Sequence, residues 1–432
     1  MAPLEESGLD ATTDSPVIDP DIQPEVLVLP EIAAPAERKI DLSPLSSVLA
    51  VFLCGVFAFI DLYATQPLLP LFERLFHASK ASVGLTVSAS TLGVALSAPF
   101  FGALAERLSR KRVIVCSILA LALPTLLAAS AGTLHALIFW RFVQGLIMPG
   151  IFAITITYIT EEWPRHSLAV VMSIYVSGTA LGGFIGRMTS GLAAEYLSWH
   201  FSFLFLGAMT LVGAGAVARW LPRERRAIPD NPGFRSQFLP MRDHLRNPRL
   251  IATFAVGFNV LFSLVGVFTY ITFYLADPPF RLSTLALSYL FVVYLVGLVV
   301  TPGAGWVVSR IGLRRGIVSA VLLSMAGVLV TLIPWLPAVI LGLALVSTGV
   351  FISQTTASSH LRDAASEGGR VSAAGLYLSF YYLGGTAAGV VPSFFWHLGK
   401  WPACVAFIVV LQFVTMTIAL FGWRSDPLAE PV

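Results

Sequence analysis

Apolar stretches about twenty residues long recur along nearly the whole chain, and they restrict the fold more than any other feature. The hydrocarbon core of a bilayer is ~30 Å thick, so a membrane-spanning helix needs ~20 apolar residues. A window of that length finds twelve segments, at roughly 45–67, 82–104, 113–131, 134–158, 168–190, 199–221, 249–276, 284–306, 317–335, 338–359, 371–394 and 401–423. Composition agrees, because 12% of the residues are charged against about 25% in soluble domains. We expect an all-α membrane protein with twelve transmembrane helices.

The connections between these segments divide the chain. Residues 222–248 form the longest connection and separate two sets of six helices. The first 43 residues hold ten acidic residues and six prolines, a composition that cannot bury a core. The predicted organisation is a disordered acidic cytoplasmic tail, a six-helix bundle, a cytoplasmic linker, a second six-helix bundle and a short cytoplasmic tail, at 1–43, 44–221, 222–248, 249–424 and 425–432.

Lysine and arginine are distributed unevenly between the two sides of the expected membrane. If the N-terminus is cytoplasmic, the inside segments carry twenty-one of these residues and the outside segments carry four. Because positive residues concentrate in cytoplasmic loops, we expect both termini in the cytoplasm. Two more arginines, Arg141 and Arg187, lie within helices. Arg187 is near the outer end of its helix, and we expect its side chain to extend to the interface.

The two sets of helices repeat a motif. Residues 173–187, SIYVSGTALGGFIGR, resemble residues 375–389, GLYLSFYYLGGTAAG, at an offset of 202 that also relates Trp199 to Trp401. A second echo relates GALAERLSRKR at 102–112 to GWVVSRIGLRR at 305–315. Two matched six-helix halves imply a pseudo-two-fold axis along the membrane normal, which places a site between the halves near the midplane.

With these motifs the chain resembles transporters of the major facilitator superfamily and, more narrowly, bacterial efflux permeases of the arabinose-efflux type. The loop after the second helix resembles the family signature GxLaDrxGRkr, although Glu106 replaces the usual Asp and Ser109 the second Gly. RFVQG at 141–145 resembles the RxxxG signature of helix 4. Helix 5 is rich in glycine but lacks the Gly-Pro of the drug-antiporter signature.

The resemblance implies a secondary active transporter that spans the bacterial inner membrane and works by alternating access. We expect proton-coupled efflux by antiport. Proton-coupled uptake by symport, or a uniporter of a sugar or small organic ion, is the alternative. The expected partners are a small-molecule substrate and the lipid bilayer, with no nucleic acid, no cofactor beyond the proton gradient, and a monomeric state.

Asp61 lies within an otherwise apolar stretch, VFLCGVFAFIDLYATQPLLP at 51–70. A charge in a membrane helix costs ~2.5–3.5 kcal/mol and usually marks function. At 1.5 Å per residue, Asp61 and Arg141 both fall ~8–10 Å inside the outer boundary. They lie on helices 1 and 4, which line the central cavity in the resembled fold. We expect an ion pair across the cavity, with Asp61 exchanging a proton; a static pair and two residues without contact are the alternatives.

Other candidates are polar or aromatic side chains on the expected cavity helices or their neighbours. They are Phe57, Gln66, Gln144, Phe152, Tyr175, Asn259, Phe262, Gln354, Tyr377 and Tyr381. For the aromatic members, simple packing is the competing interpretation. The glycines at repeat-related positions of helices 5 and 11 are expected to let helix backbones approach closely. They are Gly178, Gly182, Gly183, Gly384 and Gly385.

The basic loops between the second and third helix of each half are candidates for a cytoplasmic gate, whose ion pairs break when that side opens. The candidate residues are Gly102, Glu106, Arg107, Arg110, Lys111, Arg310 and Arg314. The alternative is that they only anchor the topology.

An enzyme is not expected. The seven histidines fall at helix ends or in loops, and the three cysteines lie in apolar runs, so neither set has metal-ligand spacing. The absence of a GxxxxGK[ST] loop argues against transport driven by ATP. A membrane receptor or scaffold is the alternative from another class, but it does not explain two duplicated halves.

Overall fold

The computed structural model describes residues 45–105, 108–224, 241–365 and 369–423. The predicted tails and most of the linker fall outside these ranges. The described residues before the linker, here called the N-terminal half, form helices with one break in the first and one in the fourth predicted span. Their bounds are α1 (Leu45–Phe59), η1 (Gln66–Leu68), α2 (Leu69–Leu75), α3 (Lys80–Ala105), α4 (Arg110–Ala128), α5 (Leu134–Ile147), α6 (Pro149–Glu162), α7 (Arg165–Tyr196) and α8 (Trp199–Trp220).

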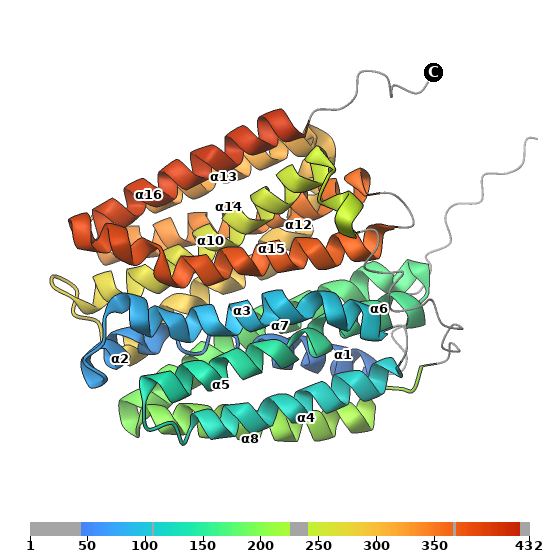
Figure 1. Cartoon of the computed structure of the whole chain (residues 1–432), viewed down its shortest axis with the longest axis horizontal. Helices are drawn as coiled ribbons and strands as arrows, with labels where there is room; N and C mark the ends of the chain where they lie inside the picture. The colour runs from blue at the N-terminus through green and yellow to red at the C-terminus, as the bar shows by residue number, and fades with distance from the viewer. Residues whose placement is uncertain (1–44, 106–107, 225–240, 366–368, 424–432) are drawn as a thin grey trace, which may run out of the picture. The chain divides into compact units, whose positions relative to one another are not determined.

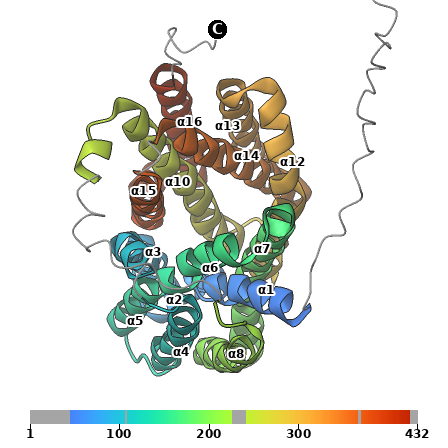
Figure 2. The same ribbon diagram turned by 90° about the vertical axis from the view of Figure 1, so that its right-hand side faces the viewer.

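The described residues from 241 to 423, here called the C-terminal half, are also helical. Their elements are α10 (Pro248–Ala276), α11 (Thr284–Tyr289), η2 (Leu290–Leu295), α12 (Val296–Ile311), α13 (Leu313–Val330), α14 (Leu336–Ala364), α15 (Arg370–Val390) and α16 (Pro392–Gly422). Figure 1 shows both sets of helices from the side and Figure 2 shows them end-on.

The all-α membrane fold predicted from the sequence is confirmed. Nine helical segments of the described chain are long and apolar enough to cross a membrane, with α5 and α6 together forming one of them, and 45–59 and 284–295 form shorter apolar helices. Two predicted spans, 371–394 and 401–423, divide differently: α15 ends at Val390, and α16 runs on through non-helical backbone at Gly399 and Lys400. The predicted count of twelve is consistent with this arrangement.

The first predicted span, 45–67, is not one continuous helix. The helix α1 ends at Phe59, and the chain continues to Leu68 through turns whose N–H groups bond three residues back, as from Gln66 to Tyr63. Pro67 and Pro70 have no N–H to continue an α-helical ladder. This break exposes backbone carbonyls inside the N-terminal half, where a polar side chain must satisfy them.

Contacts inside the two halves repeat at the offset of 202. A Cβ on Gly182 would collide with the carbonyl oxygen of Val56, and a Cβ on Gly384 would collide with that of Phe258. The rings repeat as well: Trp199 lies 5.3 Å from Phe72, and Trp401 lies 5.9 Å from Tyr274.

Tyr175 and Tyr377, which are related by the same offset of 202, also make matching contacts. Tyr175 donates to the carbonyl of Phe152 at 3.3 Å, and Tyr377 donates to Oε1 of Gln354 at 2.9 Å, so each hydroxyl bonds the residue 23 positions earlier. The predicted pseudo-symmetry is therefore present in the packing, and at Gly182 and Gly384 the close backbone approach is present with it.

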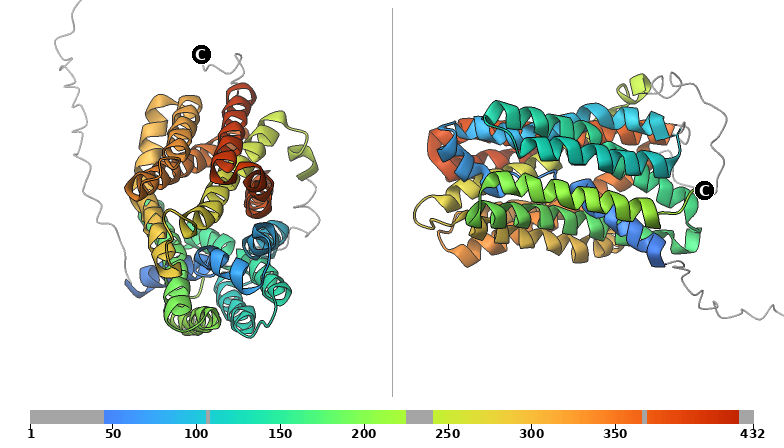
Figure 3. Two further views of the ribbon diagram at one scale, coloured as in Figure 1. Left: turned by 90° about the vertical axis from the view of Figure 1, so that its left-hand side faces the viewer. Right: turned by 90° about the horizontal axis from the view of Figure 1, so that it is seen from below.

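The two halves meet along α3 with α15 and along α7 with α11. Figure 2 and the left-hand view of Figure 3 show α3 beside α15. Within the described ranges, hydrogen bonds between the halves lie toward the end that carries α2, here called the α2 end. Ser88 donates to the carbonyl of Thr386 at 2.6 Å, and Gln66 Nε2 donates to Thr269 at 3.2 Å. At Gly84 a Cβ would collide with the carbonyl of Gly389. The α2 end is closed by direct contact between the halves.

Candidate functional site

Arg141 is the centre of a buried polar network in the N-terminal half. Its side chain is fully buried, and its three nitrogens donate five hydrogen bonds. The acceptors are the carbonyls of Asp61 (2.7 Å), Leu62 (2.5 Å) and Thr86 (3.0 Å), Oε1 of Gln144 (2.6 Å) and Oγ of Ser90 (3.0 Å). A guanidinium has five N–H donors, so every donor is used. Arg141 thereby satisfies the carbonyls that the break after α1 leaves exposed.

The carboxyl group of Asp61 lies in the same network but is poorly solvated. The residue is fully buried. Its Oδ2 lies 3.2 Å from the hydroxyl of Thr125, and its Oδ1 has no hydrogen-bond partner in the part of the chain that the structure describes. The Thr125 hydroxyl has a single hydrogen, and the Leu121 carbonyl lies closer, at 2.8 Å. An ionised carboxylate normally accepts several hydrogen bonds when buried.

The predicted ion pair between Asp61 and Arg141 requires a correction. The two residues are brought together, close enough to interact electrostatically. Within the described ranges, however, the salt bridges are Lys80–Glu73 and Arg110–Glu161, and the guanidinium bonds the Asp61 carbonyl in place of its carboxylate. The physical reason is the broken helix, because buried backbone carbonyls compete for the same donors. Helix depth and the resembled fold together predicted the proximity but not this choice of partner.

Arg187 is the second buried arginine, and the expectation that it extends to the interface is wrong. Its side chain is 1% exposed. Nε donates to Oε1 of Gln66 at 2.9 Å and Nη1 donates to the Gly183 carbonyl at 2.7 Å. Three aromatic rings surround the guanidinium, with centroids 5.0 Å from Cζ for Tyr63, 4.6 Å for Phe291 and 4.5 Å for Tyr294. Two of these rings come from the C-terminal half.

Three of the predicted cavity residues lie where the halves meet. Gln66 bridges Arg187 to Thr269 of the other half. The ring of Phe152 lies 5.9 Å from that of Tyr382, and Tyr382 in turn lies 5.4 Å from Tyr381.

Gln144, Tyr175, Gln354 and Tyr377 form their hydrogen bonds within their own halves. Gln144 joins the Arg141 network by donating from Nε2 to Thr125 at 2.8 Å. The contacts of the two tyrosines and of Gln354 are those of the repeat described above.

Three other cavity candidates face the interior of their own half, which corrects their predicted position. The ring of Phe57 packs against Gly213 of α8, and that of Phe262 lies 5.8 Å from Phe407 of α16. Asn259 lines a small cavity inside the C-terminal half, with Ser353 and Gln412. Helices that are apolar on all sides carry no stripe that marks the inward face, so the sequence could not fix their rotation.

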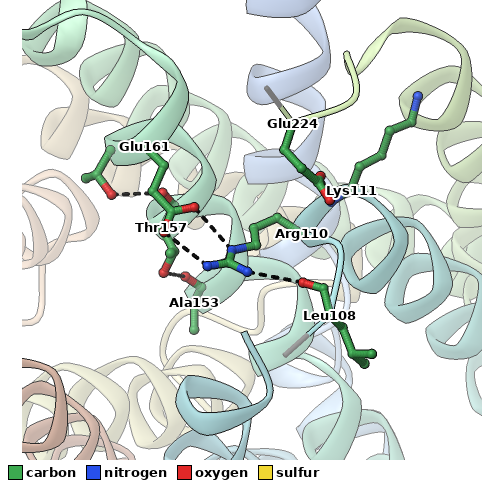
Figure 4. Close-up of polar contacts among 8 residues, drawn as sticks. Leu108, Arg110, Lys111, Ala153, Thr157, Glu161 and Glu224 are labelled. Carbon is green, nitrogen blue, oxygen red and sulfur yellow. Dashed lines mark hydrogen bonds and ion pairs between the residues drawn. The ribbon is translucent and has the colours of Figure 1, made fainter. Parts of the chain in front are cut away.

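The loop residues can be followed only in part. Glu106 and Arg107 lie outside the described residues, and Gly102 is described only as part of the backbone of α3. Arg110 donates from Nη2 and Nε to the two carboxylate oxygens of Glu161 at 3.1 and 3.2 Å (Figure 4). The two residues belong to α4 and α6 of the same half, so this pair does not join the halves.

Lys111 makes a further contact at this end of the helices: its backbone N–H donates to the carboxylate of Glu224 at 3.3 Å (Figure 4). In the C-terminal half, Arg314 donates from Nε to the carbonyl of Trp423 at 2.7 Å, and Arg310 lies in the last turn of α12. Each loop therefore ties the start of a third helix to the end of a sixth helix within one half. A gating role for these residues stays a prediction.

The comparison with known proteins agrees with this architecture. The profile of the Major Facilitator Superfamily matches residues 51–389. The chain is 33% identical over 383 residues to the uncharacterized MFS-type transporter YybF of Bacillus subtilis, covering 89% of this chain and 93% of that one. It is 31% identical over 375 residues to the inner membrane transport protein YnfM of Escherichia coli, covering 86% and 88%.

A solved structure of a bacterial homologue of the human lysosomal transporter Spinster has the same fold. Its TM-score is 0.72 at 16% identity, and the match covers 88% of this chain and 98% of that one. The two helical halves, the repeated contacts at offset 202 and the family match over residues 51–389 lead to one conclusion. The chain belongs to the major facilitator superfamily of membrane transporters.

Proposed function

We propose that this transporter couples the movement of a small molecule to protons, with Asp61 as the group that binds and releases the proton, and that it works as an efflux antiporter. The observation that carries the proposal is the carboxyl of Asp61, which is fully buried and has an oxygen without a partner among the described residues. Intramembrane carboxyl groups of this kind mark proton pathways in pumps and transporters.

The hydrogen-bond pattern around Asp61 favours its protonated form in this conformation. The Thr125 oxygen already accepts from Gln144 Nε2 at 2.8 Å and directs its hydrogen at the Leu121 carbonyl. It keeps a lone pair that can accept from a protonated Asp61 at 3.2 Å. With Asp61 ionised, the single hydroxyl hydrogen would have two acceptors and the carboxylate would have too few donors. Protonation removes this conflict.

A transport cycle follows from these contacts. Asp61 holds its proton while it is buried and shielded from water on both sides. Opening of the halves at the end opposite α2 would admit water, which solvates the carboxylate and takes the proton. Opening of the α2 end would let the carboxylate take up the next proton from that side. Arg141, fixed by its bonds to the chain at residues 61 and 62, keeps the carboxyl group close to a positive charge. That charge favours the ionised form once water is present.

For the orientation, we propose that the α2 end faces the periplasm and both termini face the cytoplasm. The support is the excess of lysine and arginine at the opposite end of the helices. The name of the E. coli relative, an inner membrane transport protein, points to the same membrane. Protons would then be taken up from the periplasm as substrate leaves, which is the direction that an antiporter requires.

Infrared difference spectroscopy tests the proton site without knowledge of the substrate. We expect purified protein at neutral pH to show the C=O stretch of a buried carboxylic acid and Asp61→Asn to lack it. The matched control is Glu161→Gln, which removes a carboxylate that Arg110 already pairs and should leave the band in place. A spectrum with no protonated carboxyl assignable to Asp61 would contradict the proposal.

Transport is tested by counterflow across a compound panel in proteoliposomes, followed by the same measurement under an imposed pH gradient. We expect Asp61→Asn to abolish accumulation against the gradient and to spare exchange. Substrate that follows the protons would indicate symport in place of antiport. A flux that does not respond to the gradient would indicate a uniporter.

A further inference from the structure

A second buried charge, Arg187, plays no part in the proposed proton step. It lies on α7 close to the closed α2 end, at the boundary between the halves. In the part of the chain that the structure describes, no carboxylate lies within ion-pair distance of it. An arginine stays charged even when buried, and an uncompensated buried charge is costly. Among the described residues, Arg187 is therefore a positive charge without a counter-ion at the place where the two halves meet.

The guanidinium is only partly satisfied. Nε and Nη1 donate to Gln66 and Gly183, whereas Nη2 has no hydrogen-bond partner among the described residues. The hydroxyl of Tyr294, whose ring lies over the same guanidinium, is also buried and without a partner in the described chain. Arg141 uses all five of its donors a short distance along the same bundle. The contrast indicates that Arg187 is built to receive an acceptor from outside the chain.

The surroundings indicate what kind of molecule that acceptor belongs to. Planar guanidinium donors match the two oxygens of a carboxylate, and a phenol hydroxyl beside them can donate a further hydrogen bond. The rings of Tyr63, Phe291 and Tyr294 form apolar walls around this point. We propose that Arg187, with Tyr294, binds the carboxylate of an amphipathic organic acid, and that this acid is the transported molecule. The inference rests on the proposed transport function and names its substrate class.

Binding at this point is linked to the contact that closes the α2 end. Gln66 accepts from Arg187 through Oε1 and donates to Thr269 of the other half through Nε2. A carboxylate that takes donors of Arg187 competes with Gln66 for them. The bond between Gln66 and Thr269 then loses its anchor, so an anionic substrate weakens the closure of the α2 end while a neutral analogue does not.

The test uses the full chain purified in detergent and pairs of probes that differ only in charge: benzoate with benzamide, and 3-phenylpropionate with its amide. Binding is measured as a ligand-induced rise in the melting temperature and as an equilibrium Kd. We expect at least one acid to bind and both amides to bind at least about tenfold more weakly, as for a lost charged hydrogen bond. Arg187→Gln should remove the preference for the acid, and Arg187→Lys should restore it only in part.

The matched control is Arg219→Gln, which removes an exposed arginine of α8 and should bind the acid as the wild type does. If Arg187→Gln does not fold, Tyr294→Phe takes its place: we expect it to weaken the acid several-fold and to leave the amide unchanged. Equal binding of acid and amide by the wild type, or an acid preference that survives Arg187→Gln, overturns the inference. The binding test in detergent involves no proton gradient, so it does not depend on proton coupling. If the acid binds but its transport in proteoliposomes does not respond to a pH gradient, proton coupling is refuted while the acid-binding site at Arg187 is retained.

Discussion

The two halves share their backbone contacts but not their charges. Glycine lets α7 approach α1 at Gly182 and lets α15 approach α10 at Gly384. Yet the positions 202 residues after Asp61 and Arg141 hold Ser263 and Leu343. The packing contacts that set the fold are therefore present in both halves, whereas the buried pair of ionisable residues, Asp61 and Arg141, occurs in the N-terminal half and has no ionisable counterpart at the repeat-related positions.

The space around these positions differs accordingly. In the N-terminal half the ring of Phe57 fills the region beside Gly213. In the C-terminal half the corresponding residues, Asn259 and Thr415, line a small cavity with Ser263, which has room for about one water molecule. The N-terminal half therefore has a charged network around Asp61 and Arg141, and the corresponding region of the C-terminal half has neutral polar groups around a small cavity.

The largest effect on the free energy of unfolding is expected when Arg141 is replaced by leucine, the residue at the corresponding position of the C-terminal half. Arg141→Leu copies Leu343 and leaves the buried carbonyls of Asp61, Leu62 and Thr86 without their donor. Loss of a buried charged partner costs roughly 3–5 kcal/mol, measured as the free energy of unfolding in bicelles. The control Val346→Ile adds one methylene at the counterpart of Gln144 and should cost far less. A loss below about 1 kcal/mol for Arg141→Leu would mean that the network does not hold the broken helix.

The repeated glycine contacts should be similar in energy. Gly182→Ala and Gly384→Ala each push a methyl group into a facing backbone carbonyl, and overpacking of this kind costs roughly 1–3 kcal/mol. Thermal unfolding of the two variants compares the costs directly. Gly215→Ala is the control, because a Cβ there meets nothing within 4 Å and should be neutral or slightly stabilising. Costs that differ by more than about 1 kcal/mol would show that the halves are symmetric in geometry but not in energy.

Removing the repeated tyrosine hydroxyls should have a smaller effect. Tyr175→Phe and Tyr377→Phe each delete one hydrogen bond, worth roughly 0.5–1.5 kcal/mol. Because the two sites lie in different halves, the double variant should lose the sum of the two within about 0.5 kcal/mol. A marked departure from additivity in unfolding experiments would reveal coupling between the halves through this layer.

The smallest effect concerns the loops at the end opposite α2. Burial raises the pKa of Glu224, but hydrogen bonds from Ser109 and the Lys111 backbone, with the charge of Arg110, outweigh it and lower the pKa. A lowered folded-state pKa gives stability above the ordinary value of 4.5, and that stability is lost as the pH falls through the folded pKa.

The magnitude should be a few tenths of a kcal/mol, since the group is largely solvated and screened by salt. As the pH falls from 7 to below the folded-state pKa of Glu224, melting temperatures should fall less steeply for Glu224→Gln than for the wild type. The corresponding contact of Arg314 uses the carbonyl of Trp423, which does not titrate. Identical profiles of melting temperature against pH for the wild type and Glu224→Gln would show that Glu224 does not contribute to the pH dependence of stability.

The membrane class, the approximate helix positions and the repeat could all be predicted from the sequence. Length and apolarity are read directly from the chain, because a bilayer of fixed thickness demands helices of fixed length. The offset that relates Tyr175 to Tyr377 is visible in the letters, and the tertiary contacts at Gly182 and Gly384 obey it. The proximity of Asp61 and Arg141 was predicted from helix depth together with the resemblance, which implies that helices 1 and 4 line one cavity.

The direction in which each side chain points could not be predicted from the sequence and follows from the packing of the helices. Apolar spans carry no polar stripe that fixes their rotation, so Phe57 and Phe262 could not be assigned to their own half's interior from the sequence. The break after Phe59 leaves the carbonyls of Asp61 and Leu62 in need of donors. Arg141 of α5 supplies these donors, in a position that is fixed by the packing of α5 against α3. Arg187 is buried because two rings from the other half, Phe291 and Tyr294, cover it. Contacts between segments a hundred residues apart are set by packing, which local sequence does not encode.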